Sequence, residues 1–385
     1  MSPAPVERLL PSDEARDLIQ LARDIADKTL APIVDEHQKA ETYPDGIFAT
    51  LGQAGLLSLP YPEEWGGGAQ PYEVYLQALE EIAARWAAVA VAVSVHSLAC
   101  HPLMSFGTAR QKADWLPDML GGNTIGAYSL SEPQAGSDPA ALTCRAAPGD
   151  DGYRITGEKA WITHGGIADF YNLFARTGTG SRGISCFLVP KETPGLTFGK
   201  PEEKMGLHAV PTTSAHYDGA FLPGERRIGA EGQGLQIAFS ALDSGRLGIA
   251  AVAVGLAQAA LDEAVAYSHQ RSTFGRKIID HQGLGFLLAD MAAAVESSRA
   301  TYLDAARRRD AGLSYSRHAS IAKLIATDAA MKVTTDAVQV LGGVGYTRDY
   351  RVERYMREAK IMQIFEGTNQ IQRLVISRDL AKQGS

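Results

Sequence analysis

The spacing of hydrophobic and polar positions divides the chain into three parts. In the first part, apolar residues recur with the 3.6-residue period of amphipathic helices. In the second, short apolar runs are separated by Gly, Pro and Asp, which is typical of β-strands. The third returns to long, Ala-rich helical stretches of the kind that form bundles. The sequence therefore predicts an α+β multidomain protein, with a helical domain, a β domain and a helix bundle at residues 1–123, 124–233 and 234–385.

The same patterns predict individual elements. Leu18, Leu21, Ile25 and Leu30 form the apolar stripe of the first helix. Further helices are predicted at residues 45–54, 111–120, 248–266, 281–309 and 319–341, and residues 72–99 are predicted to hold one or two more. Strands are predicted at residues 126–130, 153–156, 160–163, 170–175, 184–189 and 214–217. The longest apolar run, residues 87–95, is shorter than the about 20 residues of a membrane span, so we expect a buried helix there.

Composition narrows the class of protein. With 385 residues, 45% hydrophobic and 21% charged, the chain reads as an ordinary globular protein. Its net charge of -7 argues against general nucleic-acid binding, which requires a basic surface. Cys100, Cys144 and Cys186 have no CxxC spacing, so neither a disulfide framework nor a zinc site is expected. No metal-ligand motif and no export or organelle signal is visible, and a cytoplasmic location is expected.

The strongest candidate for chemistry is Glu366, which follows an apolar run. Because Ile361, Met362, Ile364 and Phe365 are expected to be buried, the carboxylate would leave the core with little water around it. Full burial raises a carboxyl pKa by roughly 3 to 5 units, into the range where the group works as a general base. The sequence therefore predicts a general base at this position.

Two neighbours bear on this prediction. Thr368 or Asn369 is a good N-cap for the last helix, and a helix N-terminus favours an anion by only about 0.3 to 1 kcal/mol, so burial is expected to dominate. Gly367 has no side chain and would let a planar substrate group lie close to the backbone. The residues alone fit a second interpretation equally well, in which Glu366 merely caps a helix.

Other motifs carry weaker signals. The loop at 128–138 is rich in hydroxyls and small residues that suit a heterocycle or phosphate, although a plain turn is the better interpretation of it alone. Asp243 and Arg246 form an ordinary i, i+3 ion pair at the predicted opening of a helix. Arg271 with Phe274 suits a nucleotide diphosphate, although a lone Arg is normally a solvated charge. Residues 342–345 lack the GxGxxG spacing of a NAD-binding fold.

Together these segments resemble the acyl-CoA dehydrogenase family, in family order and over nearly the whole chain. Residues 365–372 resemble its active-site signature, in which the residue corresponding to Glu366 removes a proton alpha to a thioester. His164 stands where the family usually has Asn. Gly245 stands where some branched-chain and long-chain members keep their catalytic Glu, so the resemblance assigns the base to Glu366.

The resemblance also implies a set of binding residues. The residues implied to bind FAD are Tyr128, Leu130, Ser131, Gly136, Ser137, Trp161, Thr163, Arg271, Phe274, Gln282, Gln339, Gly342, Gly343, Thr368 and Gln370. The residues implied to bind acyl-CoA are Ser137, Asp243, Arg246 and Gly367. Among the FAD residues, Arg271 is implied to reach the flavin nucleotide of a neighbouring subunit.

The implied fold and function follow. The family has an N-terminal helical domain, a middle β-barrel-like domain and a C-terminal four-helix bundle. The implied activity is FAD-dependent α,β-dehydrogenation of an acyl-CoA to a trans-2-enoyl-CoA in fatty acid metabolism and β-oxidation. Electrons would pass to an electron-transfer flavoprotein, and the implied assembly is a homotetramer without nucleic acid or membrane insertion. We expect short-chain or short branched acyl groups. A same-fold flavin oxidase that uses O2 and a non-catalytic flavin-binding scaffold are the alternatives.

Overall fold

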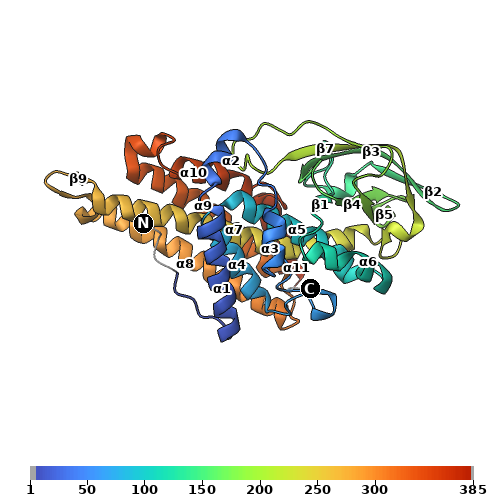
Figure 1. Cartoon of the computed structure of the whole chain (residues 1–385), viewed down its shortest axis with the longest axis horizontal. Coiled ribbons are helices and arrows are strands. Elements are labelled where there is room, and N and C mark those ends of the chain that lie inside the picture. Colours follow the sequence, from blue (N-terminus) through green and yellow to red (C-terminus); the bar gives the residue numbers. More distant parts are fainter. Residues whose placement is uncertain (1–5, 383–385) are drawn as a thin grey trace.

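The computed structural model describes residues 6–382 and has three parts in the predicted order. Helices come first, a β-sheet follows, and long helices complete the chain. In Figure 1 the sheet occupies one end of an elongated molecule, and the helices of the first and third parts lie together in the rest. The predicted fold class, helical then β then helical, is confirmed.

The first part consists of helices α1 to α6, and α1 begins where the sequence predicted. Ser12 caps α1 by accepting a hydrogen bond from the backbone N–H of Ala15. The predicted apolar stripe is partly wrong, because Leu21 is 39% exposed while Ile19 and Ala22 are buried. Small alanines on that face let α1 lie against α4. The helices are α1 Asp13–Ile25, α2 Val34–Ala40, α3 Ile47–Gln53, α4 Tyr72–Ala83, α5 Ala87–Phe106 and α6 Ala109–Leu120.

The second part is a sheet with the strand order β6-β7-β3-β2-β4-β5-β8, and β1 pairs with β4 in parallel. The predicted strands 153–156 and 160–163 form one strand, β3, whose register against β7 shifts in two places. Gly157 looks like a turn residue but extends the strand instead, with φ +143° and Cys144 packed against it. The strands are β1 Gly126–Ser129, β2 Arg145–Gly149, β3 Gly152–Thr163, β4 Phe170–Arg176, β5 Ile184–Pro190, β6 Leu196–Phe198, β7 Thr212–Pro223 and β8 Arg227–Ile228.

The third part is built on α7, a helix of 37 residues. It begins at Gly234, so Asp243 and Arg246 lie inside it and not at the predicted helix opening. The helices α8 and α9 pack on α7, and α10 and α11 pack on α9. A short hairpin, β9 and β10, projects at the end of the molecule opposite the sheet (Figure 1). The elements are α7 Gly234–Gln270, β9 Ser272–Thr273, β10 Arg276–Lys277, α8 Gln282–Asp310, α9 Ser316–Leu341, α10 Val352–Met362 and α11 Asn369–Lys382.

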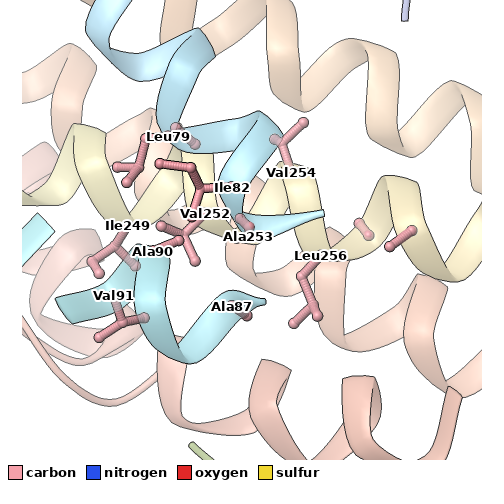
Figure 2. Close-up of a cluster of buried hydrophobic side chains, with 14 of the residues drawn as sticks. Leu79, Ile82, Ala87, Ala90, Val91, Ile249, Val252, Ala253, Val254 and Leu256 are labelled. Atoms are coloured by element: carbon pink, nitrogen blue, oxygen red, sulfur yellow. The ribbon is translucent and has the colours of Figure 1, made fainter. Parts of the chain in front are cut away.

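One hydrophobic core joins the first and third parts. Figure 2 shows Leu79 and Ile82 of α4 and Ala90 of α5 facing Ile249 and Val252 of α7. Both α5 and α7 are long and apolar enough to cross a membrane by length and composition alone, but 89% and 72% of their most apolar windows are buried inside the protein. Packing in a protein core therefore accounts for their composition, and the predicted buried helix at residues 87–95 is confirmed.

Candidate active site

Glu366 lies in a short connection between α10 and α11 whose backbone is unusual. Glu366 has φ +52° and Gly367 has φ +87°, so two consecutive residues adopt the left-handed region. For a residue with a Cβ this conformation costs roughly 1 to 2 kcal/mol, so surrounding contacts must hold it. The predicted cap is present, because Thr368 Oγ1 accepts a hydrogen bond from the backbone N–H of Ile371. The connection is therefore a defined turn, and the Glu366 carboxylate that it carries lies against α7.

The carboxylate of Glu366 is buried and is not engaged by hydrogen bonds from the residues that the structure describes. Both of its oxygens are inaccessible and lack a hydrogen-bond partner within residues 6–382. Burial raises its pKa to about 7, while the positive charges of Lys323 and Arg246 oppose that shift. These features do not fit a capping Glu, whose carboxylate would accept backbone N–H groups. The predicted burial of the apolar run is confirmed only in part: Met362 is fully buried, Ile361 and Phe365 are half-buried, and Ile364 is 48% exposed.

Gly245 of α7 closes one side of the Glu366 carboxylate. A Cβ added to Gly245 would lie closer than 3.0 Å to Oε2 of Glu366 and within 3.1 Å of a methyl carbon of Leu98. The carboxylate therefore occupies the space that a side chain at position 245 would need. The sequence predicted that Gly245 could not act as a base, and the structure places it directly against the residue that can.

Asp243 and Arg246, which flank Gly245 on α7, form the predicted ion pair. Arg246 Nη1 lies 2.6 Å from Asp243 Oδ1, and the Arg246 side chain is only 6% exposed. Ser316 of α9 donates to the same Asp243 oxygen at 2.9 Å, and Ser320 accepts from Arg246 at 3.4 Å. The buried pair is thus tied to α9 and presents a positive charge toward Glu366. A pair of this kind is far more constrained than the exposed i, i+3 pair that the sequence suggested.

Lys323 of α9 is a site residue that the sequence analysis missed. Its side chain is fully buried, and its Nζ donates to the backbone oxygen of Gly367 and to Oδ1 of Asn369, each at 2.9 Å. A signal was present in the sequence, because Lys323 is the one charged residue of the apolar run 319–326. A lone charge on a core-facing helical stretch is costly unless it has partners, and it marks a candidate site.

A buried ion pair between Lys159 and Glu132 stabilises the hydroxyl-rich loop after β1. Lys159 Nζ lies 2.8 Å from Glu132 Oε1 and donates to the backbone oxygen of Leu130 at 2.9 Å. Glu132 also accepts the backbone N–H groups of Thr143 and Cys144. Burial alone would raise the pKa of Glu132, but Lys159 and these hydrogen bonds outweigh burial and lower it. The loop is therefore a fixed surface and not a plain turn.

Several predicted flavin residues gather where this loop meets β3. The backbone N–H of Ala160 donates to the oxygen of Ser131, which places Trp161 beside the loop. Trp161 has φ +60° and its side chain is 63% exposed, so it is not the core residue that its type suggests. Ser137 and Gly136 are also exposed, Thr163 is half-buried, and Leu130 is buried.

Two further residues lie at the base of this region, Tyr128 half-buried and His164 buried. Tyr128 donates to the backbone oxygen of Ala238 on α7 and lies near enough to Glu366 for the carboxylate to raise its pKa further, in addition to burial. His164, which stands where the family usually has Asn, is fully buried and bonded through Nδ1 to the oxygen of Gly126. Tyr128 thus links the β-domain surface to the carboxylate.

The remaining predicted FAD residues do not join this cluster within one chain. Arg271 and Phe274 lie at the β9–β10 hairpin, at the opposite end of the molecule from the sheet (Figure 1). Phe274 is 96% exposed, which is unusual for a large aromatic side chain. Thr368 and Gln370 lie beside Glu366 in the chain, Thr368 half-buried and Gln370 exposed. The other members are also exposed, and they are Gln282, Gln339, Gly342 and Gly343.

These residues fit a flavin nucleotide divided between two surfaces. Trp161 offers an exposed aromatic face beside fixed backbone groups, which suits a planar ring system. Gly136 has open space where a side chain would stand, so a ligand can approach its backbone. Arg271 and Phe274 offer a guanidinium and an exposed ring at the far end. By contrast, residues 6–382 contain no group of three or more His, Cys, Asp or Glu side chains that could hold a metal ion.

Comparison with known proteins agrees with this geometry. Models of the N-terminal, middle and C-terminal domains of acyl-CoA dehydrogenase match residues 12–123, 127–220 and 232–381. An acyl-CoA dehydrogenase of Bacillus subtilis (strain 168) is 44% identical over 364 residues, which cover 94% of this chain and 96% of that protein. A short-chain specific acyl-CoA dehydrogenase of Clostridium acetobutylicum is 42% identical, covering 93% of this chain and 95% of the relative.

A solved structure agrees as well. The butyryl-CoA dehydrogenase of Megasphaera elsdenii superposes with a TM-score of 0.95 at 40% identity, covering 97% of this chain and all of the other. The family is FAD-dependent. The matched domains, the near-complete coverage and the shared fold lead to one conclusion: this chain belongs to the acyl-CoA dehydrogenase family.

Proposed function

We propose that Glu366 is the general base of a short-chain acyl-CoA dehydrogenase and removes the proton from the carbon alpha to the thioester. One observation carries the proposal: the carboxylate is buried, without a hydrogen-bond partner among residues 6–382, and has a pKa raised to about 7. A general base is most effective when its pKa lies near the working pH. A weakly solvated carboxylate also gains more from taking up a proton than a hydrated one.

The surrounding residues bind the substrate and stabilise the negative charge that develops on its thioester carbonyl. Asp243 and Arg246 contact the CoA portion, Ser137 approaches it from the β-domain loop, and Gly367 leaves room for the thioester. The backbone N–H of Glu366 polarises the thioester carbonyl and lowers the cost of the developing enolate. Glu366 takes the alpha proton onto a carboxylate oxygen. When bound beside these residues, FAD would supply the acceptor for the two electrons and the beta hydrogen that the substrate loses.

The FAD-binding residues define the proposed assembly. Tyr128, Ser131, Trp161 and Thr163 hold the flavin ring end on one protomer. Because the Arg271 hairpin lies at the opposite end of the molecule (Figure 1), it binds the nucleotide half of a neighbouring protomer's FAD. The proposed enzyme is a homotetramer with domains at 1–123, 124–233 and 234–385. It passes electrons to an electron-transfer flavoprotein in the cytoplasm, where the free, buried Cys100, Cys144 and Cys186 would stay reduced.

The contact between α5 and α7 supports a short acyl group. A Cβ added to Gly248, one turn along α7 from Gly245, would lie closer than 3.0 Å to Oγ of Ser94 on α5. The two helices therefore touch one turn beyond the Glu366 carboxylate, and Val91 of α5 and Ile249 of α7 belong to the same buried hydrophobic cluster (Figure 2). A chain entering between them has little depth, so butyryl-CoA and similarly short thioesters are the proposed substrates.

Anaerobic titration with acyl-CoAs of increasing length tests the proposal. Bleaching of the flavin absorbance by butyryl-CoA, with weak or no bleaching by octanoyl-CoA and palmitoyl-CoA, is expected. Stronger bleaching by the long chains would contradict the proposed pocket depth. Oxygen consumption without an added acceptor would favour the flavin oxidase, and a flavin that no thioester bleaches would favour the non-catalytic scaffold.

A further inference from the structure

Lys323 is buried directly beneath the connection that carries Glu366. It projects from α9, is fully inaccessible, and donates from Nζ to the oxygen of Gly367 and to Oδ1 of Asn369. Both acceptors belong to the residues that immediately follow Glu366. Lys323 therefore contacts the backbone of the candidate catalytic turn and not the reacting groups themselves.

A comparison with the other fully buried lysine shows that this arrangement is unusual. Lys159 is paired with the carboxylate of Glu132 at 2.8 Å, which offsets the cost of burying its charge. The hydrogen-bond acceptors of Lys323 are instead two neutral oxygens, a backbone carbonyl and a side-chain amide. Burying a cation with only neutral acceptors costs stability. A buried ammonium with neutral acceptors therefore points to a functional site and not to a purely structural contact.

The turn needs a restraint of this kind. Glu366 and Gly367 both have positive φ, and a residue with a Cβ does not adopt that conformation without support. The carbonyl of Gly367 is held from two sides, by Lys323 Nζ and by Gln372 Nε2 at 2.7 Å. Asn369, the second acceptor of Lys323, is fixed in turn by Asp328 and Thr327 of α9. The direction of the Glu366 side chain therefore depends on contacts that originate on α9.

The charges around Glu366 come from few elements. Two cations face it, Lys323 from α9 and Arg246 from α7. The titratable groups of the other packed elements are Tyr72 and Tyr75 of α4 and Tyr128 of β1, and burial of their hydroxyls raises their pKa values above the ordinary value for tyrosine. Burial lowers the pKa of Lys323 from its ordinary value, and the charge of Glu366 opposes that shift and favours the ammonium form.

We propose that Lys323 is a positioning residue for the reaction: its ammonium fixes the Gly367 carbonyl and so aims the Glu366 carboxylate, and its charge stabilises the ionised carboxylate. The proposal rests on the assignment of Glu366 as the base. Lys323 bonds to the turn and not to the Glu366 carboxylate, whose oxygens have no hydrogen-bond partner among residues 6–382. Its removal should therefore affect proton abstraction while leaving FAD binding and acyl-CoA binding intact.

Two variants separate the parts of this role. Lys323→Met removes the charge and the hydrogen bonds, whereas Lys323→Gln removes the charge but keeps a donor. Lys332→Met is the matched control, because Lys332 lies on the same helix, is 63% exposed and pairs with Asp336 on the helix surface. The measurement is the rate of flavin reduction by butyryl-CoA in anaerobic stopped flow from pH 5.5 to 9.5, together with the flavin-to-protein ratio.

The expected result has three parts. Both Lys323 variants keep the wild-type flavin content, and Lys323→Met slows flavin reduction by about 10- to 100-fold. In both, the midpoint of the pH profile moves about one unit higher, because loss of a nearby cation makes the Glu366 carboxylate harder to ionise. Lys323→Gln retains more of the rate than Lys323→Met, and Lys332→Met matches the wild type.

The remaining outcomes overturn the proposal. An unchanged pH midpoint in both variants would show that the charge of Lys323 does not act on Glu366. Failure of both variants to accumulate as flavin-containing protein, while Lys332→Met accumulates, would assign Lys323 to folding. Failure of the proposed function gives a different result. If Glu366 is not the base, Glu366→Gln reduces flavin at the wild-type rate although Lys323 is intact.

Discussion

The carboxylate of Glu366, in the α10–α11 connection, fills the space that a side chain at Gly245 of α7 would need. A Cβ at position 245 would lie closer than 3.0 Å to Oε2 of Glu366. The two residues are more than a hundred positions apart in the sequence. Their contact means that only a glycine at 245 lets the carboxylate reach its observed position. It also accounts for the burial of the carboxylate, because α7 covers it without offering a hydrogen bond.

Gly245→Ala tests this relationship. The added methyl group should push the Glu366 carboxylate from its position and slow flavin reduction by about tenfold or more, since small misplacements of a reacting group are costly. FAD content should stay unchanged. The rate is measured anaerobically with butyryl-CoA. Gly285→Ala on α8 is the control, because a Cβ there meets nothing closer than 3.9 Å. Equal rates for both variants would contradict the contact.

The pKa of Glu366, raised to about 7 by burial, predicts a pH dependence with a definite sign. The base acts when ionised, so flavin reduction should rise with pH and reach half of its maximum near pH 7. A midpoint near the ordinary carboxyl value of 4.5 would contradict the burial.

The free energy of unfolding should change with pH in the opposite direction to the rate of flavin reduction. In the unfolded chain Glu366 loses its proton near 4.5, so between about 4.5 and 7 the folded state binds more protons. The free energy of unfolding should therefore fall as the pH rises through that window, by about 1 to 3 kcal/mol from this group. Thermal denaturation at pH 5 and pH 8, compared between wild type and Glu366→Gln, isolates the contribution of Glu366 from that of other groups.

Much of this site was predictable from local sequence. The apolar run before Glu366 predicts burial, and burial raises the carboxyl pKa as expected. The cap at Thr368 and the pair of Asp243 with Arg246 follow from short spacings along helices. These features depend on neighbours within one or two turns, which a periodic pattern contains.

The missed features depend on contacts between distant elements. Lys323 became a site residue because α9 passes beneath a turn some forty positions later in the chain. The continuity of β3 through Gly157 depends on its packing against Cys144, and the exposure of Leu21 depends on which face of α1 meets α4. Periodicity alone does not determine such choices, because tertiary packing selects among locally similar solutions.

Lys159→Met should release the proposed flavin loop. The substitution leaves the buried Glu132 without its cation, and removing one partner of a buried pair typically costs about 3 to 5 kcal/mol. We expect a lower melting temperature and a lower flavin-to-protein ratio, measured by calorimetry and absorbance. Lys200→Met, at an exposed lysine of the same domain, is the control and should behave as the wild type. Full flavin content in Lys159→Met would show that the ion pair does not brace the loop.

Arg271→Ala tests the proposed sharing of FAD between protomers. The exposed guanidinium contributes nothing to the core of its own chain, so thermal stability of the apoprotein should be unchanged. FAD content of the purified protein should fall, because a fork-shaped contact to the diphosphate is lost. Arg276→Ala, on the same hairpin, is the matched control. A flavin-to-protein ratio equal in both variants would count against the assignment.

The most direct test of the central claim is the single-turnover reduction of FAD in Glu366→Gln. The substitution keeps the size of the side chain and removes its ability to accept a proton, so FAD and butyryl-CoA should bind as in the wild type. Flavin bleaching under anaerobic conditions should fall by about 10²-fold or more, at the lower end of what a positioned base contributes. Bleaching at a near-normal rate would show that another group removes the proton and that Glu366 is not the base.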